Sequence, residues 1–167
     1  MIEYVQGNLI QAFINSQIDV LVHGCNCYCT MGAGIALQIK NTFPSAYEKD
    51  CRTKLQYNNP KDKLGKISYD YILRKDGKLG LIINAYTQET YWDTKRKVSY
   101  EAISSSMKEV YKLCSDYNVK IGMPFIGCGL GGANWKIVSN LINNVFEDRT
   151  IFVYYLNKTD YKINVQS

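Results

Sequence analysis

The chain has 167 residues, of which 46% are hydrophobic, and this length supports one sizeable core rather than two domains. Its formal net charge of +5 favours anionic partners. It has no run of roughly 20 apolar residues that could span a membrane and no leader-like start, so we expect a soluble, cytoplasmic, monomeric protein without a membrane partner. We assign residues 1–157 to a single domain and residues 158–167 to a short, polar, loosely held tail.

Six cysteines raise the question of disulfides or a metal site. Cys25, Cys27 and Cys29 alternate along the chain, so on extended backbone they would line one side and could not surround a tetrahedral ion. There is no CxxC pair, and His23 is the only histidine. We therefore expect free, structural thiols, no metal site and no cofactor.

The first half of the chain alternates strand and helix patterns. The spacing of apolar residues predicts a strand at 2–5, a helix at 9–15 with Asn8 as its N-cap, an apolar strand at 18–23, and a helix that carries Ile35, Ile39 and Phe43 and ends before Pro44. A further helix is predicted at 45–55, with Ser45 as its N-cap and Glu48 in the capping-box position. Residues 57–65 are predicted to be a loop. Two basic clusters are expected to be solvated, namely Lys61, Lys63 and Lys66, and Lys95, Arg96 and Lys97.

The second half begins with two strands, at 67–73 and 80–87, which Asp76-Gly77 joins as a hairpin. The polar stretch at 88–97 is predicted to form a loop beside the site. A long amphipathic helix at about 98–117 follows, and then a strand at 119–125, a helix at 135–147 and a strand at 150–156. Alternating strands and helices predict an α/β fold, a three-layer α/β/α sandwich with a mixed, largely parallel sheet.

Two stretches share one design, VLVHGCNCYCTMGAGIA at 20–36 and VKIGMPFIGCGLGGANWKIV at 119–138. In each, an apolar strand leads into a glycine-bearing loop and then into a helix. Such a loop directs free backbone amide groups and the positive end of a helix dipole at one place, which suits a phosphate. One such loop would more often be a turn, but two at the carboxyl ends of strands predict a site for a ligand with two phosphates.

Three polar side chains are candidates for chemistry near these loops. His23 is the only imidazole and the natural general base, acid or nucleophile, although a core histidine bound to a carbonyl is the alternative. Asn26 carries an uncharged amide that suits ribose hydroxyls, and it could otherwise be a turn residue. Asn84 ends the apolar run LIINA and is an interior strand residue unless it faces the same pocket.

Several familiar catalytic motifs are missing. The sequence has no GxxxxGK[ST] lysine, no GxGxxG with a suitable acidic residue, no GxSxG and no HExxH. Neither glycine loop contains a carboxylate that could hold a metal for phosphoryl transfer. The residues therefore favour binding more strongly than catalysis.

The strings YVQGN, HGCNCYCTMGAGIALQIKNTFP and MPFIGCGLGGANW, followed by IFVYYL, together resemble the macrodomain family, which binds ADP-ribose. The resemblance spans essentially the whole chain. HGCNC with its glycine loop and the LGK turn at 64–66 is most similar to the small ADP-ribose 1″-phosphate phosphatases. MGAGIAL and GCGLGG are also similar to the branches that remove ADP-ribose from DNA or from protein glutamates.

The resemblance implies a role for each matching position. Asn8, where many macrodomains have aspartate, would meet the adenine amino group. Residues 31–36 would wrap the distal ribose and one phosphate, and residues 127–131 would hold the diphosphate. His23 and Asn26 would be catalytic, with Asn26 reaching the distal-ribose hydroxyls. The predicted ligand-binding set is Gly7, Asn8, Leu9, Met31, Gly32, Ala33, Gly34, Ile35, Ala36, Asn84, Ile126, Gly127, Cys128, Gly129, Leu130 and Gly131.

Two departures from the glycohydrolase branches bear on the activity. Those branches use a lysine after the middle strand, where this chain reads NAYTQETYW and has no lysine before Lys95. The protein-glutamate branch also uses an aspartate after GCGL, where this chain has Gly131. Amine attack on the anomeric carbon therefore lacks its nucleophile, unless Lys95 or Lys97 reaches the site.

The leading hypothesis is a metal-independent phosphatase that removes the terminal phosphate of ADP-ribose 1″-phosphate, with His23 as base or nucleophile. One alternative is a binding module that captures ADP-ribose or a related nucleotide without turnover. Another is a glycohydrolase with a relocated lysine, acting on an ADP-ribosylated macromolecule. The last is a reader of RNA or poly-ADP-ribose that uses the many tyrosines for stacking.

Overall fold

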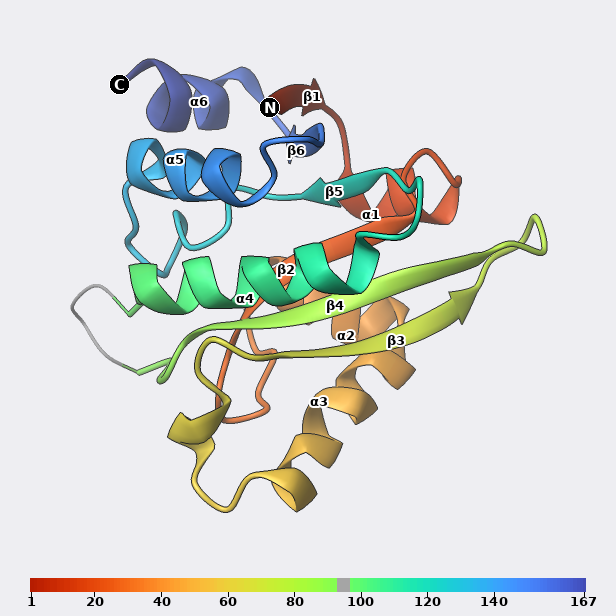
Figure 1. The fold of residues 1–167 in the computed structure, drawn as a ribbon, viewed down its shortest axis with the longest axis vertical. Coiled ribbons are helices and arrows are strands. Elements are labelled where there is room, and N and C mark those ends of the chain that lie inside the picture. Colours follow the sequence, from red (N-terminus) through yellow and green to blue (C-terminus); the bar gives the residue numbers. More distant parts are fainter. Residues whose placement is uncertain (93–96) are drawn as a thin grey trace.

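A single mixed sheet runs through the computed structural model, which describes residues 1–92 and 97–167 (Figure 1). Within these residues, six strands lie in the order β1-β6-β5-β2-β4-β3. Neighbouring strands are parallel except β3 and β4, which form the hairpin expected at Asp76-Gly77. The strands are β1 (Ile2–Gln6), β2 (Val20–Asn26), β3 (Ile67–Leu73), β4 (Leu79–Gln88), β5 (Ile121–Met123) and β6 (Ile151–Tyr155).

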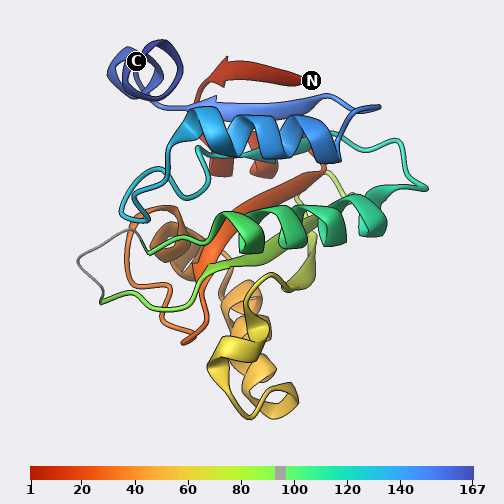
Figure 2. The same ribbon diagram turned by 60° about the vertical axis from the view of Figure 1, so that its left-hand side comes forward.

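Helices cover both faces of this sheet and confirm the three-layer α/β/α sandwich (Figures 1 and 2). One face carries α1 (Leu9–Ile14), α2 (Gly34–Thr42) and α3 (Pro44–Gln56). The other carries α4 (Tyr100–Cys114) and α5 (Trp135–Val145). Three short elements complete the described chain, η1 (Pro60–Lys63), α6 (Lys158–Tyr161) and η2 (Lys162–Gln166).

The central strand β2 contributes side chains to two separate cores, because successive side chains point to opposite faces of a sheet. Val20 and Val22 pack under α4 and α5, whereas Leu21 packs under α1 and α2. All three are buried. A strand covered on both faces reads as a continuous apolar run, which is why the sequence identified this one.

The predicted helix boundaries hold in outline and differ in detail. Asn8 caps α1 as expected, since its Oδ1 accepts from the amide of Gln11 at 3.0 Å. Ser45, however, is not an N-cap. Pro44 is the first residue of α3, where its fixed φ and missing N–H fit the first turn, and Ser45 lies exposed one residue later. The loop at 57–65 contains η1, α4 is shorter than predicted, and the strand at 119–125 is reduced to β5.

Lys63 corrects the expectation of a solvated basic cluster. Its side chain is buried, with Nζ 3.2 Å from Oδ1 of Asp50 and 4.1 Å from the ring centroid of Tyr86. Nζ also lies 3.3 Å from Sγ of Cys29. Lysine is rarely buried without a partner, and here a carboxylate and an aromatic face compensate the charge. Lys95 and Arg96 of the second cluster lie outside the described residues.

The three alternating cysteines do not share one strand. β2 ends at Asn26, so only Cys25 belongs to it, and Cys29 sits in a turn with φ of +57°. The cysteines of residues 1–92 and 97–167 are free, and these residues contain no group of three His, Cys, Asp or Glu side chains that could hold a metal ion. None of their helices is long and apolar enough to cross a membrane.

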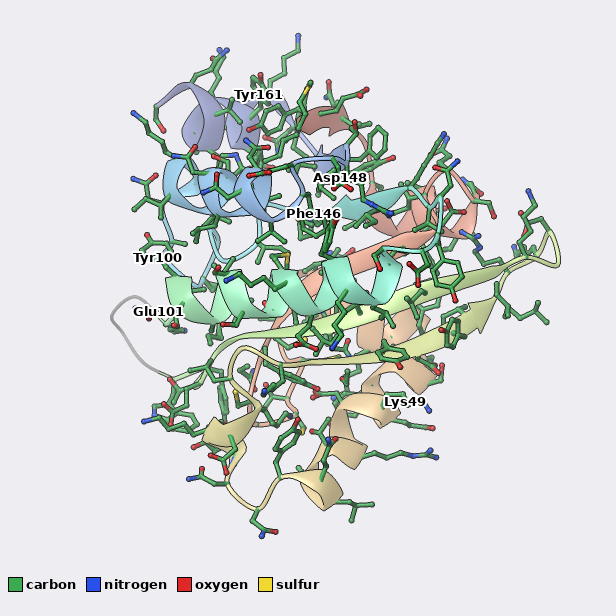
Figure 3. All side chains as sticks on the ribbon, viewed as in Figure 1. Lys49, Tyr100, Glu101, Phe146, Asp148 and Tyr161 are labelled. Atoms are coloured by element: carbon green, nitrogen blue, oxygen red, sulfur yellow. The ribbon has the colours of Figure 1, made fainter. Side chains whose placement is uncertain are left out.

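The C-terminal segment (residues 156–166) contains the helical elements α6 and η2 and packs against the rest of the fold, although the sequence suggested a loosely held tail. Tyr161, labelled in Figure 3, packs against the rings of Tyr4 and Tyr155, with centroids 5.5 and 5.0 Å away. Val165 packs against the core beneath α5. The segment therefore borders the β1–β6 edge of the sheet and brings both chain termini to one end of the molecule (Figures 1 and 2).

Candidate functional site

A pocket of about 860 Å³ lies at the edge of the sheet where the parallel strands end. Its walls come from the residues that follow β1, β2, β4, β5 and β6. This volume is in the range of small-molecule sites, and the carboxyl ends of parallel strands are where such sites occur in open α/β sheets.

The first glycine loop (residues 27–33) leaves β2 at Asn26, whose amide gives the loop its shape. Oδ1 of Asn26 accepts from the backbone amide of Tyr28 at 2.8 Å, and Nδ2 donates to Oγ1 of Thr30 at 2.7 Å. The hydroxyl of Tyr47 donates to the carbonyl of Cys29 at 3.1 Å. Met31 has φ of +40° and a buried side chain, which anchors the loop from below. Both polar groups of Asn26 are thus used in building this wall.

Helix α2 begins directly after this loop with its first amide groups uncapped. Side chains of Asn8, Ser99 and Asn134 cap α1, α4 and α5, whereas the N-cap of α2 is Ala33, which has no side-chain oxygen. The first turn of a helix has four amide groups without intrahelical acceptors. These groups and the positive end of the helix dipole border the pocket, where they suit a negative charge.

The second glycine loop (residues 126–132) follows β5 and closes on itself. The amide of Ala133 donates to the carbonyl of Gly127 at 2.8 Å, and Gly127 has φ of +77°. A Cβ at position 131 would lie 2.6 Å from that carbonyl oxygen, so only glycine fits there. Within the described part of the chain, the amides of Gly129 and Leu130 donate to no protein acceptor. They are available to a ligand.

His23 and Asn84, both predicted site residues, do not line the pocket. β2 continues three residues beyond His23, so this side chain lies inside the strand, on the face that Leu21 also shares. Asn84 is its register partner on β4. Nδ2 of Asn84 donates to the carbonyl of Ala46 on α3 and to Oγ of Ser68, both at 3.1 Å. The two side chains are therefore fully buried between the sheet and α3.

The protonation of His23 follows from this setting. Because Oδ1 of Asn84 is an acceptor, Nε2 of His23 donates to it at 2.7 Å. Burial lowers the pKa of His23 to about 4, and the hydrogen bond to Asn84 and the charge of Asp50 only partly oppose this. The imidazole is neutral near pH 7 and has no access to a ligand, so the expectation that it acts as base or nucleophile is not supported by its position.

The remaining sixteen predicted site residues, including Asn26, do line the pocket. Most of the other lining residues were not predicted, because they lie at strand ends, on helices and in the C-terminal segment, which come together only through a strand order that the sequence does not reveal. Gln88, the last residue of β4, and Lys97 belong to the polar stretch at 88–97, which the sequence placed beside the site. The lining residues without a role in the prediction are Gly24, Cys25, Thr30, Gln38, Asp50, Thr87, Gln88, Tyr91, Pro124, Phe125, Tyr154, Tyr155, Leu156, Asp160, Ile163 and Asn164.

No activated thiol borders the pocket within the described residues. Burial raises the pKa of Cys25 well above its usual range and the pKa of Cys128 to about 12, so both are protonated near pH 7. The one lysine in the described lining is Lys97, whose Nζ donates to the carbonyl of Tyr91 at 2.9 Å. The site is thus rich in amide donors and poor in nucleophiles.

Both glycine loops border one pocket at the ends of parallel strands, and such an arrangement is typical of domains that bind phosphate-bearing small molecules. The family model Macro domain matches residues 22–142, and the chain belongs to this macrodomain family, whose members bind ADP-ribose or hydrolyse its derivatives.

The chain is similar to three proteins of known name or structure. It is 34% identical to ADP-ribose glycohydrolase OARD1 of Bos taurus over 158 residues, which cover 93% of this chain and 91% of that protein. It is 27% identical over 184 residues to the ADP-ribose 1″-phosphate phosphatase of Debaryomyces hansenii, covering 94% and 100%. The solved macrodomain of Mycobacterium tuberculosis DarG has the same fold, with a TM-score of 0.77, 24% identity and coverage of 94% and 99%.

Proposed function

We propose that the protein binds ADP-ribose in this pocket and removes the terminal phosphate of ADP-ribose 1″-phosphate. The observation that supports the binding is the pair of glycine loops, which follow β2 and β5, border one pocket and leave the amide groups of Gly129, Leu130 and the start of α2 without a protein acceptor among the described residues. The second loop would hold the diphosphate, and the first loop with the N-terminus of α2 would hold the distal ribose and its 1″ substituent.

The reaction depends on the amide donors of the first loop and of the N-terminus of α2. Water attacks phosphorus, the bond between phosphorus and the 1″ oxygen breaks, and ADP-ribose and inorganic phosphate are released. The amide groups stabilise the charge on the transferring phosphoryl group, which is the main task in this chemistry. Asn26 acts as a positioning residue, because its side chain builds the first loop. His23 takes no direct part.

Phosphate release from ADP-ribose 1″-phosphate, measured in the presence of a chelator, tests this proposal. We expect release by the wild type and by His23→Asn, which preserves a hydrogen-bonding side chain in the core. A parallel titration with ADP-ribose reports binding alone. If ADP-ribose binds and no phosphate is released, the phosphatase proposal is wrong and the protein is a binding module or acts on another ADP-ribosyl linkage.

Glycohydrolase activity is the second candidate, and the position of Lys97 favours it. This lysine lines the pocket, and the OARD1 relative is named as a glycohydrolase. An amine at this place could attack the anomeric carbon of an ADP-ribosylated macromolecule. Release of ADP-ribose from modified DNA and from a glutamate-modified peptide should then be lost in Lys97→Ala and kept in Lys136→Ala, a lysine outside the pocket. Equal activity of the two variants would contradict a role for Lys97.

A further inference from the structure

The pocket has an end that neither glycine loop reaches. In the sheet, β6 and β1 lie beyond β5, on the side away from β2. The pocket wall there consists of the start of α1, the end of β6 and the C-terminal segment, with Asn8, Tyr154, Asp160, Ile163 and Asn164 among its lining residues. Aromatic and apolar surface next to polar groups suits a planar base rather than a phosphate.

Asn8 offers mainly a donor at this end. Its Oδ1 is engaged in capping α1 through the amide of Gln11 at 3.0 Å. The group left to a ligand is therefore its NH₂, which donates two hydrogen bonds and accepts none. The exocyclic amino group of adenine is also a donor, so it needs an acceptor from elsewhere.

Asp160 supplies an acceptor that the protein itself does not use. Its backbone is fixed from both sides, because its amide donates to Oδ1 of Asn157 and its carbonyl accepts from Nδ2 of Asn164, each at 2.9 Å. Its carboxylate makes no hydrogen bond or ion pair with residues 1–92 or 97–167, and it lines the pocket while only partly exposed. A carboxylate near an anionic ligand is tolerated only where that ligand presents N–H or O–H donors.

We infer that the carboxylate of Asp160 accepts a hydrogen bond from the exocyclic amino group of the bound purine, so that the C-terminal segment, and not residue 8, determines base preference. This rests on the proposed binding of ADP-ribose. Tyr154 and Ile163 provide apolar contact to the base, and Asp160 distinguishes an amino group from a carbonyl at the base edge. The preferred ligands are adenosine diphosphate derivatives, and their hypoxanthine counterparts bind more weakly.

Calorimetric titration with ADP-ribose and with inosine diphosphate ribose, which carries a carbonyl in place of the amino group, tests the inference. The wild type should bind ADP-ribose more tightly. Asp160→Ala should weaken ADP-ribose binding by about tenfold, the effect of a lost hydrogen bond to a charged group at a partly exposed position, and should leave the hypoxanthine analogue unchanged or tighter. Adding Asn8→Asp to Asp160→Ala should restore the preference for adenine.

Asp62→Ala is the matched control, because Asp62 is an exposed aspartate on η1 that does not line the pocket. It removes the same charge and should keep the wild-type preference. An unchanged preference in Asp160→Ala, or equal weakening of both ligands, would overturn the inference while leaving ADP-ribose binding intact. If the wild type binds neither ligand, the proposed function itself fails, and the inference fails with it.

Discussion

The role of His23 depends on how far it lies from the end of β2. The sequence marked it as a candidate because it ends an apolar run beside a glycine loop. The backbone extends to Asn26, however, and alternation then directs the imidazole toward α3. Which residue ends a strand depends on pairing with its neighbours, here β4 and β5, and this pairing is not encoded locally.

The buried imidazole makes the stability of the protein depend on pH. The pKa of His23 is about 4 in the folded protein and 6.5 for the free side chain, so the unfolded state binds more protons between these values. Stability should therefore be complete above pH 6.5 and fall as the pH is lowered toward 4, by about 3 kcal/mol for this group. Urea unfolding at several pH values measures it. His23→Asn should lose less stability over the same range, and identical pH dependence would contradict the assignment.

Lys63 carries a second prediction at the residue scale. Lys63→Met leaves the buried carboxylate of Asp50 without its cation, so we expect a loss of about 3–5 kcal/mol in the free energy of unfolding. The double variant Lys63→Met with Asp50→Leu should recover part of this loss. Lys61→Ala, an exposed neighbour, should change stability by less than about 0.5 kcal/mol. If Lys63→Met is as stable as the wild type, the buried pair is energetically neutral.

The glycine loops were predictable as elements because their chemistry is local. A strand, a run of small residues and a helix can be read in order, and both loops are at the predicted positions. The sequence did not show which glycines are sterically required. Gly131 is required because Gly127 faces it across a tight turn, whereas Gly129 has open space around its Cβ direction.

This difference predicts opposite outcomes for two neighbouring substitutions. Gly131→Ala forces the carbonyl of Gly127 to move and should weaken ADP-ribose binding by at least about tenfold, because the loop amide groups lose their alignment. Gly129→Ala meets no atom within 4 Å and should fold normally, so any loss it causes comes from contact with the ligand itself. Isothermal titration and thermal unfolding of both variants separate these effects. If Gly131→Ala unfolds at the same temperature as the wild type and binds ADP-ribose equally well, the proposed geometry is wrong.

At the scale of the whole molecule, the alternating strand and helix patterns predicted the layers and the largely parallel sheet. They did not predict one wall of the pocket. That wall requires β6 to lie beside β1 and the C-terminal segment to fold back over them. The C-terminal segment is rich in polar residues such as Lys158 and Asn164, so its packing through Tyr161 and Val165 was not predicted. The packing described rests on two side chains, Tyr161 and Val165, which are too few to give a periodic apolar signal in the sequence.

Removal of residues 158–167 tests the contribution of this segment. The shortened chain keeps all six described strands, so it should fold and give a cooperative transition. It loses the packing of Tyr161 on Tyr4 and of Val165 on the core, which should lower the free energy of unfolding by about 2–4 kcal/mol. Circular dichroism with urea titration measures both. A chain that fails to fold would show that residues 1–157 are not an independent domain, and unchanged stability would show that the packing contributes nothing.

The pairing of β1 with β6 also has a consequence for synthesis of the chain. Residues 2–6 are synthesised long before their one partner strand in the described sheet, which residues 151–155 form. During translation β1 therefore stays without this partner until residues 151–155 have been made, and the pocket wall made by residues 156–166 is added later still. A nascent chain that has not reached residue 156 lacks this wall, so ligand retention on translating ribosomes would report when the wall forms.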